Sequence, residues 1–340
     1  MRHAVITGTG SYVPERVLTN ADLAERIGAD IEPFVSETLG IRTRHVCGPD
    51  ESTADLAEAA GKRALAAAGL EPRDIDLLIV ATDTPEYVSP ATSSVVHGRL
   101  GVSRAGSFDL NSGCAGYVTA LDVAWKYIRA DERYSRVLVI GAYAMSKFLD
   151  YSDKKTATIF ADGAGATVVE LASAPGVLAS ELFADGTLCD GMGIFAGGTA
   201  EPITSDVLDS GVRNKLRFVQ KYPKEVNEAG WPRITSSVLD RIGRRPADVD
   251  LWLWTQVNLS TIRLVMETLG VSMEKAHTIM GKWGYTGAAC LPMALDDALA
   301  AGRLHEGDLV MLTGSGAGLS MGAVALEWRP GARLSPKVTR

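Results

Sequence analysis

Apolar runs recur along the chain in two similar patterns. The segment "PRDIDLLIV" at 72–80 reappears as "PADVDLWLW" at 246–254, an offset of 174 residues, and each copy ends in an apolar run with the length of a buried strand. Each run follows a stretch with the spacing of an amphipathic helix, 54–70 in the first copy and 231–243 in the second. Strands without polar alternation are typical of sheets that helices cover on both faces. The pattern therefore predicts an α/β protein.

The repeat also relates two glycine-rich segments. "SGCAGYVTALDVA" at 112–124 matches "TGAACLPMALDDA" at 286–298, and the shared offset pairs Cys114 with Ala288. A cysteine in only one copy is what a single active site at the junction of two similar halves would produce. The duplication predicts two related α/β units, with a boundary between 1–175 and 176–340.

Composition and charge limit the class of protein. The chain has 340 residues, of which 46% are hydrophobic and 22% charged, as in an ordinary globular enzyme. No apolar run reaches the roughly 18 to 20 residues of a membrane span, and the N-terminus lacks the apolar core of a signal peptide, so we expect a cytoplasmic protein with no membrane partner. A net charge of −7 argues against a nucleic-acid partner. The four cysteines are scattered, so neither a metal site nor a disulfide framework is expected.

Cys114 is the candidate nucleophile. It stands between a strand-like "SFDL" with "NSG" and a helical pattern, so we expect it in the first turn of a helix. The N–H groups and the dipole of a helix N-terminus favour a thiolate and lower the pKa of a thiol from about 8.5. The alternative is a buried structural cysteine, which is the commoner fate of a free thiol. The local residues alone leave both interpretations open.

The order of motifs along nearly the whole chain resembles that of a known family. The motifs are "GTGSYVPERVLTNADLAE", "GIRTRH", "SGCAGYVTAL", "FADGAGATVVE", "WGYTGAACLPMALDDA" and "GSGAGLSMGAVALEW". In this order they resemble β-ketoacyl-acyl carrier protein synthase III (KAS III) of the thiolase superfamily. The resemblance implies a homodimer of thiolase folds, in which two duplicated α/β halves form five αβαβα layers. It also implies that Cys114 accepts an acyl group as a thioester.

Two positions depart from the family pattern. The resemblance places a histidine in a "PHQAN"-like segment and an asparagine in a "GNTSAAS"-like turn, where this chain has Thr255 in "LWTQVNL" and Tyr285 in "WGYTGAAC". In the family both side chains stabilise the enolate that forms when a malonyl thioester loses CO2, and removing one such donor typically costs ~10² to 10³ in rate. Acylation needs only backbone N–H groups, which the family takes from the positions of Cys114 and Ala317. We therefore expect acylation to survive and carbon–carbon bond formation to be impaired.

These departures favour an acyltransferase. It would move an acyl group, aryl groups included, from a thioester of a carrier protein, CoA or a small thiol to a hydroxyl or amine of a small-molecule acceptor, without a further cofactor. In this combination of a retained cysteine and substituted partners, the chain resembles the KAS III-like acyltransferases of antibiotic biosynthesis, such as those of the pactamycin type. The first alternative is a β-ketoacyl synthase with a substituted triad. The second is a non-catalytic partner in a heterodimer, and the presence of Cys114 argues against it.

The candidate general bases are Tyr285, Thr255 through a water, and His277. The alternative interpretation of His277 is a hydrogen-bonded core histidine.

Four further positions correspond to the family's substrate contacts. Phe34 lies where the family stacks the CoA adenine, and Lys154 lies near the position of a family arginine. Arg263 is one turn from the position of the arginine that docks the carrier protein. Ser89 replaces a bulky residue that closes the acyl pocket across the dimer interface, which predicts room for a larger or aromatic acyl group. The alternative is that these four differences are neutral surface changes.

Overall fold

Two β-sheets form the framework of the protein. The computed structural model describes residues 2–220, 222–223 and 225–334. The first sheet has the strand order β1 (His3–Tyr12), β7 (Asp162–Ala172), β6 (Arg136–Ala144), β4 (Leu77–Ala81) and β5 (Gly106–Leu110). The second has the order β11 (Leu251–Trp254), β12 (Leu309–Gly316), β13 (Ser320–Glu327) and β8 (Val177–Ala184). The boundary predicted after residue 175 falls in the loop between β7 and β8.

The two sheets share one pattern of pairing. In the first, β4 runs parallel to β6, which is antiparallel to β7, and β1 pairs with β7. In the second, β11 runs parallel to β12, which is antiparallel to β13, and β8 pairs with β13. The segments that repeat in the sequence thus occupy equivalent strands, β4 and β11. Their apolar residues are buried in both sheets.

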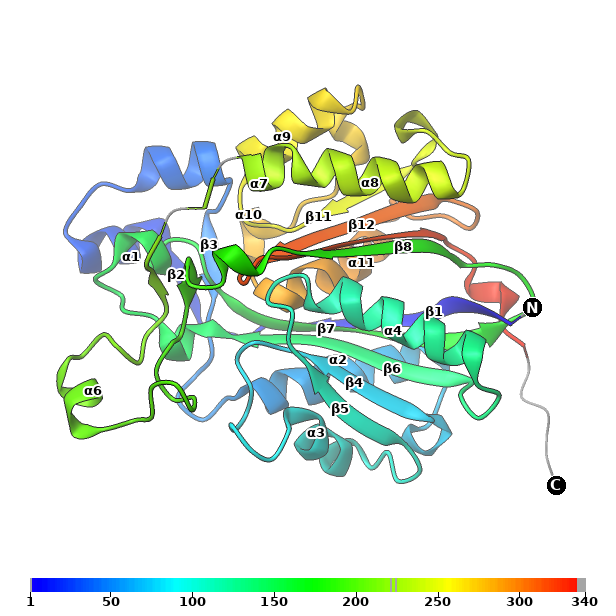
Figure 1. Ribbon diagram of the computed structural model, residues 1–340, viewed down its shortest axis with the longest axis horizontal. Helices are drawn as coiled ribbons and strands as arrows, with labels where there is room; N and C mark the ends of the chain where they lie inside the picture. Colours follow the sequence, from blue (N-terminus) through cyan, green and yellow to red (C-terminus); the bar gives the residue numbers. More distant parts are fainter. Residues whose placement is uncertain (1, 221, 224, 335–340) are drawn as a thin grey trace.

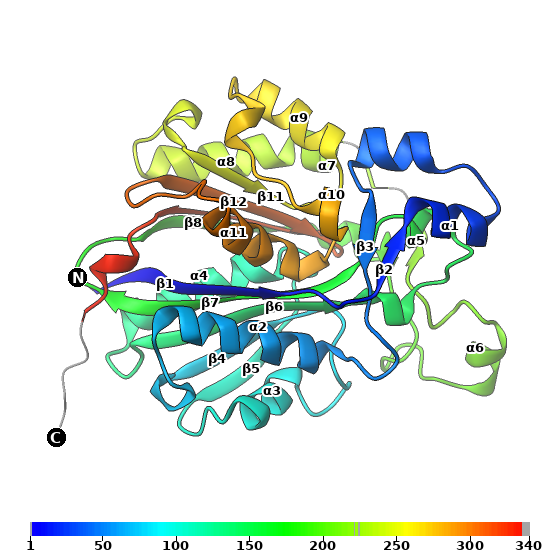
Figure 2. The ribbon, with the colours of Figure 1, turned by 180° about the vertical axis from the view of Figure 1, so that it is seen from behind.

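Helices separate and cover the sheets in five layers (Figures 1 and 2). Between the sheets lie α4 (Gly116–Ala130) and α11 (Cys290–Ala300). The first sheet is covered on its outer face by α2 (Thr53–Ala68) and α3 (Thr92–Leu100), and the second by α8 (Gly230–Arg241) and α9 (Leu259–Thr268). This is the αβαβα arrangement that the resemblance implies, so the predicted fold class is confirmed.

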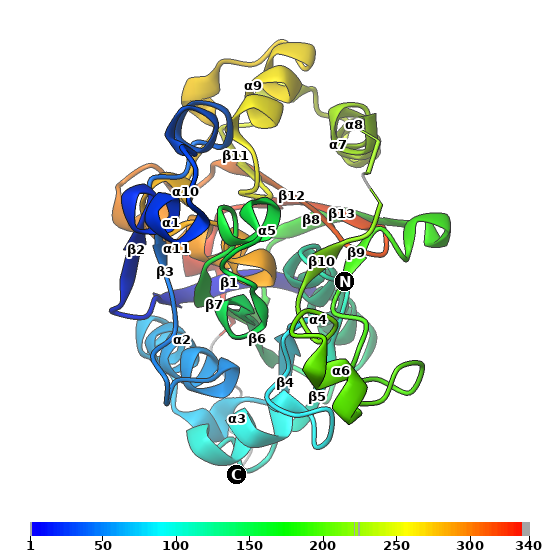
Figure 3. The ribbon, with the colours of Figure 1, turned by 90° about the vertical axis from the view of Figure 1, so that its left-hand side faces the viewer.

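Short elements gather at one end of the layers, which Figure 3 shows face on. They are β2 (Val17–Thr19) paired with β3 (Thr43–His45), β9 (Met192–Gly193) paired with β10 (Arg217–Phe218), and the helices α1 (Asn20–Ile27), α5 (Lys154–Ala157), α6 (Ser205–Asp209), α7 (Glu225–Glu228) and α10 (Met280–Trp283). They surround the end of the central layer at which α4 and α11 begin.

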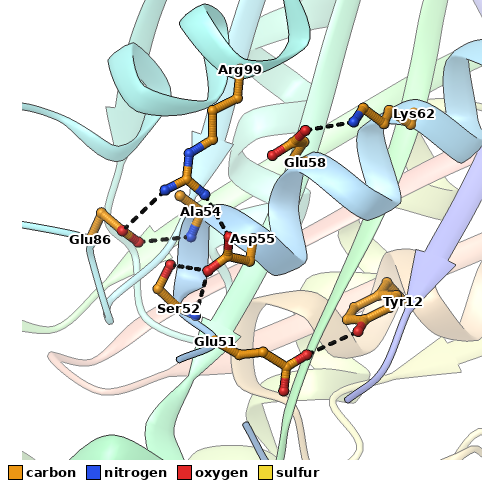
Figure 4. A network of polar contacts seen from close by, with 9 residues as sticks. All are labelled: Tyr12, Glu51, Ser52, Ala54, Asp55, Glu58, Lys62, Glu86 and Arg99. Carbon is orange, nitrogen blue, oxygen red and sulfur yellow. Dashed lines mark hydrogen bonds and ion pairs between the residues drawn. The ribbon is translucent and has the colours of Figure 1, made fainter. Parts of the chain in front are cut away.

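A polar network fixes the start of α2 against the loop that follows β4 (Figure 4). The backbone N–H and the hydroxyl of Ser52 donate to the Asp55 carboxylate at 2.8 and 2.6 Å, which closes the first turn of the helix. Glu86 in the loop accepts from the backbone N–H of Ala54 at 2.9 Å, and Arg99 of α3 lies 2.7 Å from Asp55 and 3.8 Å from Glu86. A carboxylate at a helix N-terminus is stabilised by the free N–H groups there. The loop after β4 is therefore tied to two helices.

The helix that follows Cys114 begins later than the sequence suggests. Ala115 is the N-cap and Gly116 is the first residue of α4, so Cys114 lies just outside the helix and not in its first turn. Gly113 takes φ of +52°, a conformation that favours glycine, and this turns the chain between β5 and α4. Cys114 is thus held in a tight loop at the helix N-terminus.

The two halves touch through a glycine in the middle of β6. A Cβ atom on Gly141 would lie 2.4 Å from the backbone oxygen of Ala288, in the turn before α11. Ala288 is the residue that the repeat pairs with Cys114. The absence of a side chain at Gly141 therefore sets how closely the second half approaches the first sheet.

We expect Gly141→Ala to lower the free energy of unfolding by about 1 to 3 kcal/mol, because the added methyl group has no space against a backbone atom. Gly98→Ala is the matched control: Gly98 is an exposed position in α3 with nothing within 4 Å of the added Cβ. Alanine there should be neutral or slightly stabilising. Urea unfolding of both variants checks this, and equal stabilities would contradict the role given to Gly141.

Candidate active site

A cavity of about 510 Å³ opens at the end of the central helical layer. Cys114, Thr255 and Tyr285 all line it, although they come from the loop before α4, the end of β11 and the turn before α11. Ala317, which follows β12, lines the same cavity. The fold thus brings together four of the residues singled out in the sequence, including both backbones expected to form the oxyanion hole.

Glycines allow the loop that carries Cys114 and the segment that carries Ala317 to approach each other closely. A Cβ atom on Gly316 would lie 2.3 Å from the backbone nitrogen of Cys114, and one on Gly113 would lie 3.0 Å from the backbone nitrogen of Ala317. No larger residue fits at Gly316 without moving the cysteine loop. The glycine-rich segment after β12 therefore positions the Cys114 loop, as well as contributing to the cavity wall.

The Cys114 thiol is almost closed to solvent, with 4% of the residue exposed. Burial raises its pKa well above the ordinary value, and the negative charge of Asp83 adds to the rise. A hydrogen bond from the Tyr285 hydroxyl acts in the opposite direction. The expectation of a lowered thiol pKa is therefore wrong, because loss of solvation outweighs the favourable position beside a helix N-terminus.

Tyr285 lines the same cavity as Cys114. It is buried, and its pKa lies well above 10.0, first because of burial and then because of the neighbouring thiol groups of Cys114 and Cys290. Such a phenol keeps its proton at physiological pH. Tyr285 can therefore stabilise a thiolate or an oxyanion, and its raised pKa favours a donor role over that of the general base that the sequence allowed.

Thr255 is held at the end of β11 by two backbone contacts. Its N–H donates to the Thr313 carbonyl at 3.0 Å, and its hydroxyl oxygen accepts from the backbone N–H of Ser315 at 2.9 Å. The hydroxyl hydrogen remains available to a group in the cavity. Thr255 is thus fixed in the wall of the cavity that Cys114 also lines.

His277 does not reach the cavity. Its Nδ1 lies 3.0 Å from Nη1 of Arg303, which can only donate, so Nε2 carries the proton that binds Asp297 at 2.8 Å. Both ring nitrogens are engaged, and His277 is absent from the cavity lining. The structure therefore supports the alternative of a hydrogen-bonded core histidine, and His277 as a general base is wrong.

Of the four expected substrate contacts, the structure brings only Phe34 to the cavity. Phe34 is 58% exposed and lies at the rim. Lys154 begins α5, Arg263 lies on α9 and Ser89 lies in the loop after β4; all three are exposed and none lines the cavity. Within one copy of the chain, these three positions are surface residues.

A second, smaller cavity of about 240 Å³ adjoins the first and contains an acidic side chain that sequence reasoning missed. Asp83 lines it, and Met192 and Ala317 line both cavities. Burial raises the pKa of Asp83 to about 6. The signal in the sequence was the position of Asp83, two residues after the buried strand β4, since ligands of α/β proteins bind at the carboxyl ends of strands.

Two other classes of site are not found in the part of the chain that the structure describes. Its histidine, cysteine and acidic side chains form no group of three or more that could hold a metal ion. None of its helices is long and apolar enough to cross a membrane.

Comparison with known proteins identifies the class. The model of the family "3-Oxoacyl-[acyl-carrier-protein (ACP)] synthase III" matches residues 108–186, and its C-terminal model matches residues 239–328. The crystal structure of 3-oxoacyl-(acyl carrier protein) synthase III from Pseudomonas aeruginosa aligns with a TM-score of 0.87 at 33% identity, covering 98% of this chain and 100% of that one. The priming β-ketosynthase of the R1128 polyketide pathway aligns with a TM-score of 0.87 at 29% identity, covering 96% and 97%. The protein has the thiolase fold.

Sequence relatives define the family within that fold. The β-ketoacyl-[acyl-carrier-protein] synthase III of Caldanaerobacter subterraneus is 36% identical over 329 residues, covering 96% of this chain and 98% of the relative. That of Syntrophomonas wolfei is 36% identical over 327 residues, covering 95% and 97%. The chain belongs to the KAS III family of the thiolase superfamily.

We expect the alkylation rate of Cys114 by iodoacetamide to rise with pH up to at least pH 9 without a plateau, because its raised pKa keeps the thiol protonated below that pH. Tyr285→Phe should slow alkylation at each pH, because it removes the hydrogen bond that stabilises the thiolate. Peptide mass mapping measures both rates, with the exposed Cys189 in the same sample as the internal reference. A plateau near pH 7 would show that the thiol pKa is low.

Proposed function

We propose that this protein is an acyltransferase that carries the acyl group on Cys114 and passes it to a hydroxyl or an amine. The observation that supports this most directly is that the Cys114 thiol and the Tyr285 phenol line one cavity, where the phenol acts to lower the pKa of the thiol. A protonated phenol stands where the family resemblance leads us to expect an asparagine. The site can therefore assist chemistry at sulfur without the pair of side chains that the family uses to form a carbon nucleophile.

The first half-reaction loads the cysteine. The Cys114 sulfur attacks the carbonyl carbon of the donor thioester, a new S–C bond forms, and the donor's S–C bond breaks. The donor leaves as a thiol with the proton that Cys114 gave up. Backbone N–H groups of Cys114 and Ala317 are suited to stabilise the oxyanion that forms between these steps.

The second half-reaction returns the proton to sulfur. A hydroxyl or amine of the acceptor attacks the thioester carbon, the bond to Cys114 breaks, and the proton of the acceptor passes to the departing sulfur. A thiolate whose pKa is raised by burial is a good proton acceptor, so the sulfur itself can do the work of the missing histidine. The Tyr285 hydroxyl offsets the poorer leaving ability of such a sulfur by donating to it.

The second candidate is a β-ketoacyl synthase with a substituted triad. It is favoured by the names of the relatives, which are β-ketoacyl-[acyl-carrier-protein] synthases III. In that case the hydroxyls of Thr255 and Tyr285 would stabilise the enolate of a malonyl thioester. A phenol reaches farther than the side chain of asparagine and takes space that the malonyl group would need, so we favour the acyltransferase.

The donors suited to this site are thioesters of an acyl carrier protein, CoA or a small thiol, with no other cofactor. The acyltransferases of antibiotic biosynthesis are the functional class that this chemistry fits. We further propose that the active form is a homodimer. The loop after β4 supports this because it exposes two apolar side chains, Tyr87 at 54% and Val88 at 87%.

Cys114→Ala is expected to abolish acyl loading, because it removes the sulfur that forms the thioester. The change deletes little volume, so the unfolding curve should stay close to that of the parent. Intact-mass analysis after incubation with acyl thioesters measures loading as the added mass of the acyl group. Transfer at the parent rate by Cys114→Ala would rule out the acyl-cysteine intermediate.

The parent protein is expected to release little CO2 from malonyl thioesters, because each well-placed oxyanion donor is worth ~10² to 10³ in rate. The double variant Thr255→His with Tyr285→Asn should recover decarboxylation and lose transfer to oxygen or nitrogen. CO2 release and acyl transfer to simple alcohols and amines are measured side by side, with each single variant as a control. Rapid decarboxylation coupled to a β-keto product in the parent protein would establish the synthase instead.

A further inference from the structure

The larger cavity, which Cys114 lines, carries a negative charge. Of the described residues in its wall, Glu228 of α7 is the only charged one. Glu228 is half-buried, and its carboxylate makes no ion pair or hydrogen bond with any other residue that the structure describes. A carboxylate attracts cations, and the attraction is stronger where protein walls of low dielectric surround the charge. The cavity is therefore suited to a positively charged ligand.

The neighbouring residue presents N–H donors to the same cavity. Asn227 also lines it, and its Oδ1 accepts from the Ser315 hydroxyl at 2.8 Å. The Ser315 hydroxyl oxygen in turn accepts from the indole N–H of Trp231 at 3.1 Å. An indole N–H can only donate, so the hydroxyl hydrogen is left for Asn227 and fixes the direction of the amide. The Nδ2 group of Asn227 has no partner among the described residues and can donate to a ligand.

A buried tryptophan holds this network in place. The Trp231 side chain is fully buried and stacks on the ring of Trp254 in β11, with the ring centroids 5.3 Å apart. The helix α7 packs against α8, which contains Trp231, and against α9 (Figure 1). Polar groups on a supported segment are already oriented, so a ligand does not have to order them when it binds.

The network also reaches the backbone that contacts the nucleophile. Ser315 lies near the end of β12, where its N–H donates to the Thr255 hydroxyl at 2.9 Å. The next residue, Gly316, is the glycine whose Cβ would lie 2.3 Å from the nitrogen of Cys114. Asn227 thus bonds to the residue that precedes this contact. A ligand held by Asn227 would therefore share the cavity with the acyl group on Cys114.

The charge of this wall distinguishes the acceptor from the donor. A malonyl group and the phosphates of CoA are anions, which a carboxylate repels. An aliphatic amine is protonated at physiological pH, and Glu228 attracts it. A protonated amine has no free electron pair with which to attack a thioester. The ammonium group at Glu228 and the group that is acylated must therefore be different parts of the acceptor.

We propose that Asn227 and Glu228 bind the acceptor, and that the acceptor is a hydroxylated amine. Its ammonium group would pair with Glu228, one hydroxyl oxygen would accept from Asn227, and a separate hydroxyl or neutral amine would be acylated. This inference rests on the proposed function, since it concerns the second half-reaction. In that step the acceptor's oxygen or nitrogen bonds to the thioester carbon, the bond to the Cys114 sulfur breaks, and the acceptor's proton passes to that sulfur.

The test separates loading from transfer. Cys114 is first acylated with the N-acetylcysteamine thioester of an acetyl, butanoyl or benzoyl group, and the remaining thioester is removed. The acylated protein is then mixed with acceptors that share two hydroxyl groups and differ in the third substituent. That substituent is a hydroxyl in glycerol, a carboxylate in glycerate, an ammonium in 3-aminopropane-1,2-diol and a trimethylammonium in its quaternary analogue. Mass spectrometry of protein and product gives the rate constant for transfer to each.

We expect 3-aminopropane-1,2-diol to accept the acyl group roughly 10- to 100-fold faster than glycerol, as for a hydrogen bond between charged groups. Glycerate should be the slowest acceptor, because Glu228 repels its carboxylate. The quaternary analogue has no reactive amine, so its transfer should also exceed that of glycerol if charge sets the preference. A rate no higher than that of glycerol would show that the reactivity of the amine, and not Glu228, sets it.

Variants assign the preference to the two residues. Glu228→Gln should remove the preference for the cationic acceptors. Glu225→Gln is the matched control, because Glu225 is an exposed carboxylate on the same helix that does not line the cavity, and it should keep the parent preference. Asn227→Ala should slow transfer to all four acceptors by roughly 3- to 10-fold. Loading of Cys114 should stay at the parent rate in all three variants.

The outcomes separate this inference from the proposed function. Equal transfer to all four acceptors in the parent protein would overturn the inference and leave the acyltransferase intact. A preference that persists in Glu228→Gln would overturn it as well. Loading that falls together with transfer in Glu228→Gln or Asn227→Ala would assign these residues to the donor instead. Loading without transfer to either cationic acceptor would overturn the acceptor class, and failure of every thioester to load Cys114 would refute the proposed function and this inference with it.

Discussion

Close contact between the backbones of the two halves is the constraint on which the site depends. Gly316 of the second sheet meets the nitrogen of Cys114, and Gly141 of the first sheet meets the turn before α11. Both contacts require glycine, since a side chain at either position would push the other half away. Cys114 and Tyr285 hold their mutual positions in the cavity because these two contact points carry no side chain.

The site differs from a cysteine–histidine pair in how it stabilises the negative charge of a thiolate. A histidine partner would lower the pKa of a thiol by sharing its proton, but here the Asp83 carboxylate raises the pKa of Cys114. The hydroxyl groups of Tyr285 and Thr255, which line the same cavity, can donate hydrogen bonds without accepting a full proton. In the proposed mechanism, thiolate character at Cys114 therefore develops together with attack on a substrate.

The sequence predicted the parts of this structure that follow from repetition and from motif order. The repeat of 72–80 at 246–254 identified equivalent strands in the two sheets, and motif order indicated that Cys114, Thr255 and Tyr285 share one cavity. It failed where three-dimensional surroundings decide the outcome. The direction in which the pKa of Cys114 shifts depends on burial. The position of His277 depends on its contacts with Asp297 and Arg303, which lie 20 or more residues further along the chain. Asp83 was missed because a lone acidic residue after a strand has no motif.

The burial of Cys114 also has a consequence for the lifetime of the enzyme between turnovers. Oxidants such as peroxide react with thiolates, and their attack converts cysteine first to a sulfenic acid and then to forms that are not readily reversed. A thiol kept protonated and 4% exposed presents little of the reactive form, whereas Cys189 lies open at the surface. Oxidative damage should therefore begin at Cys189, and the nucleophile should survive long intervals without an acyl donor.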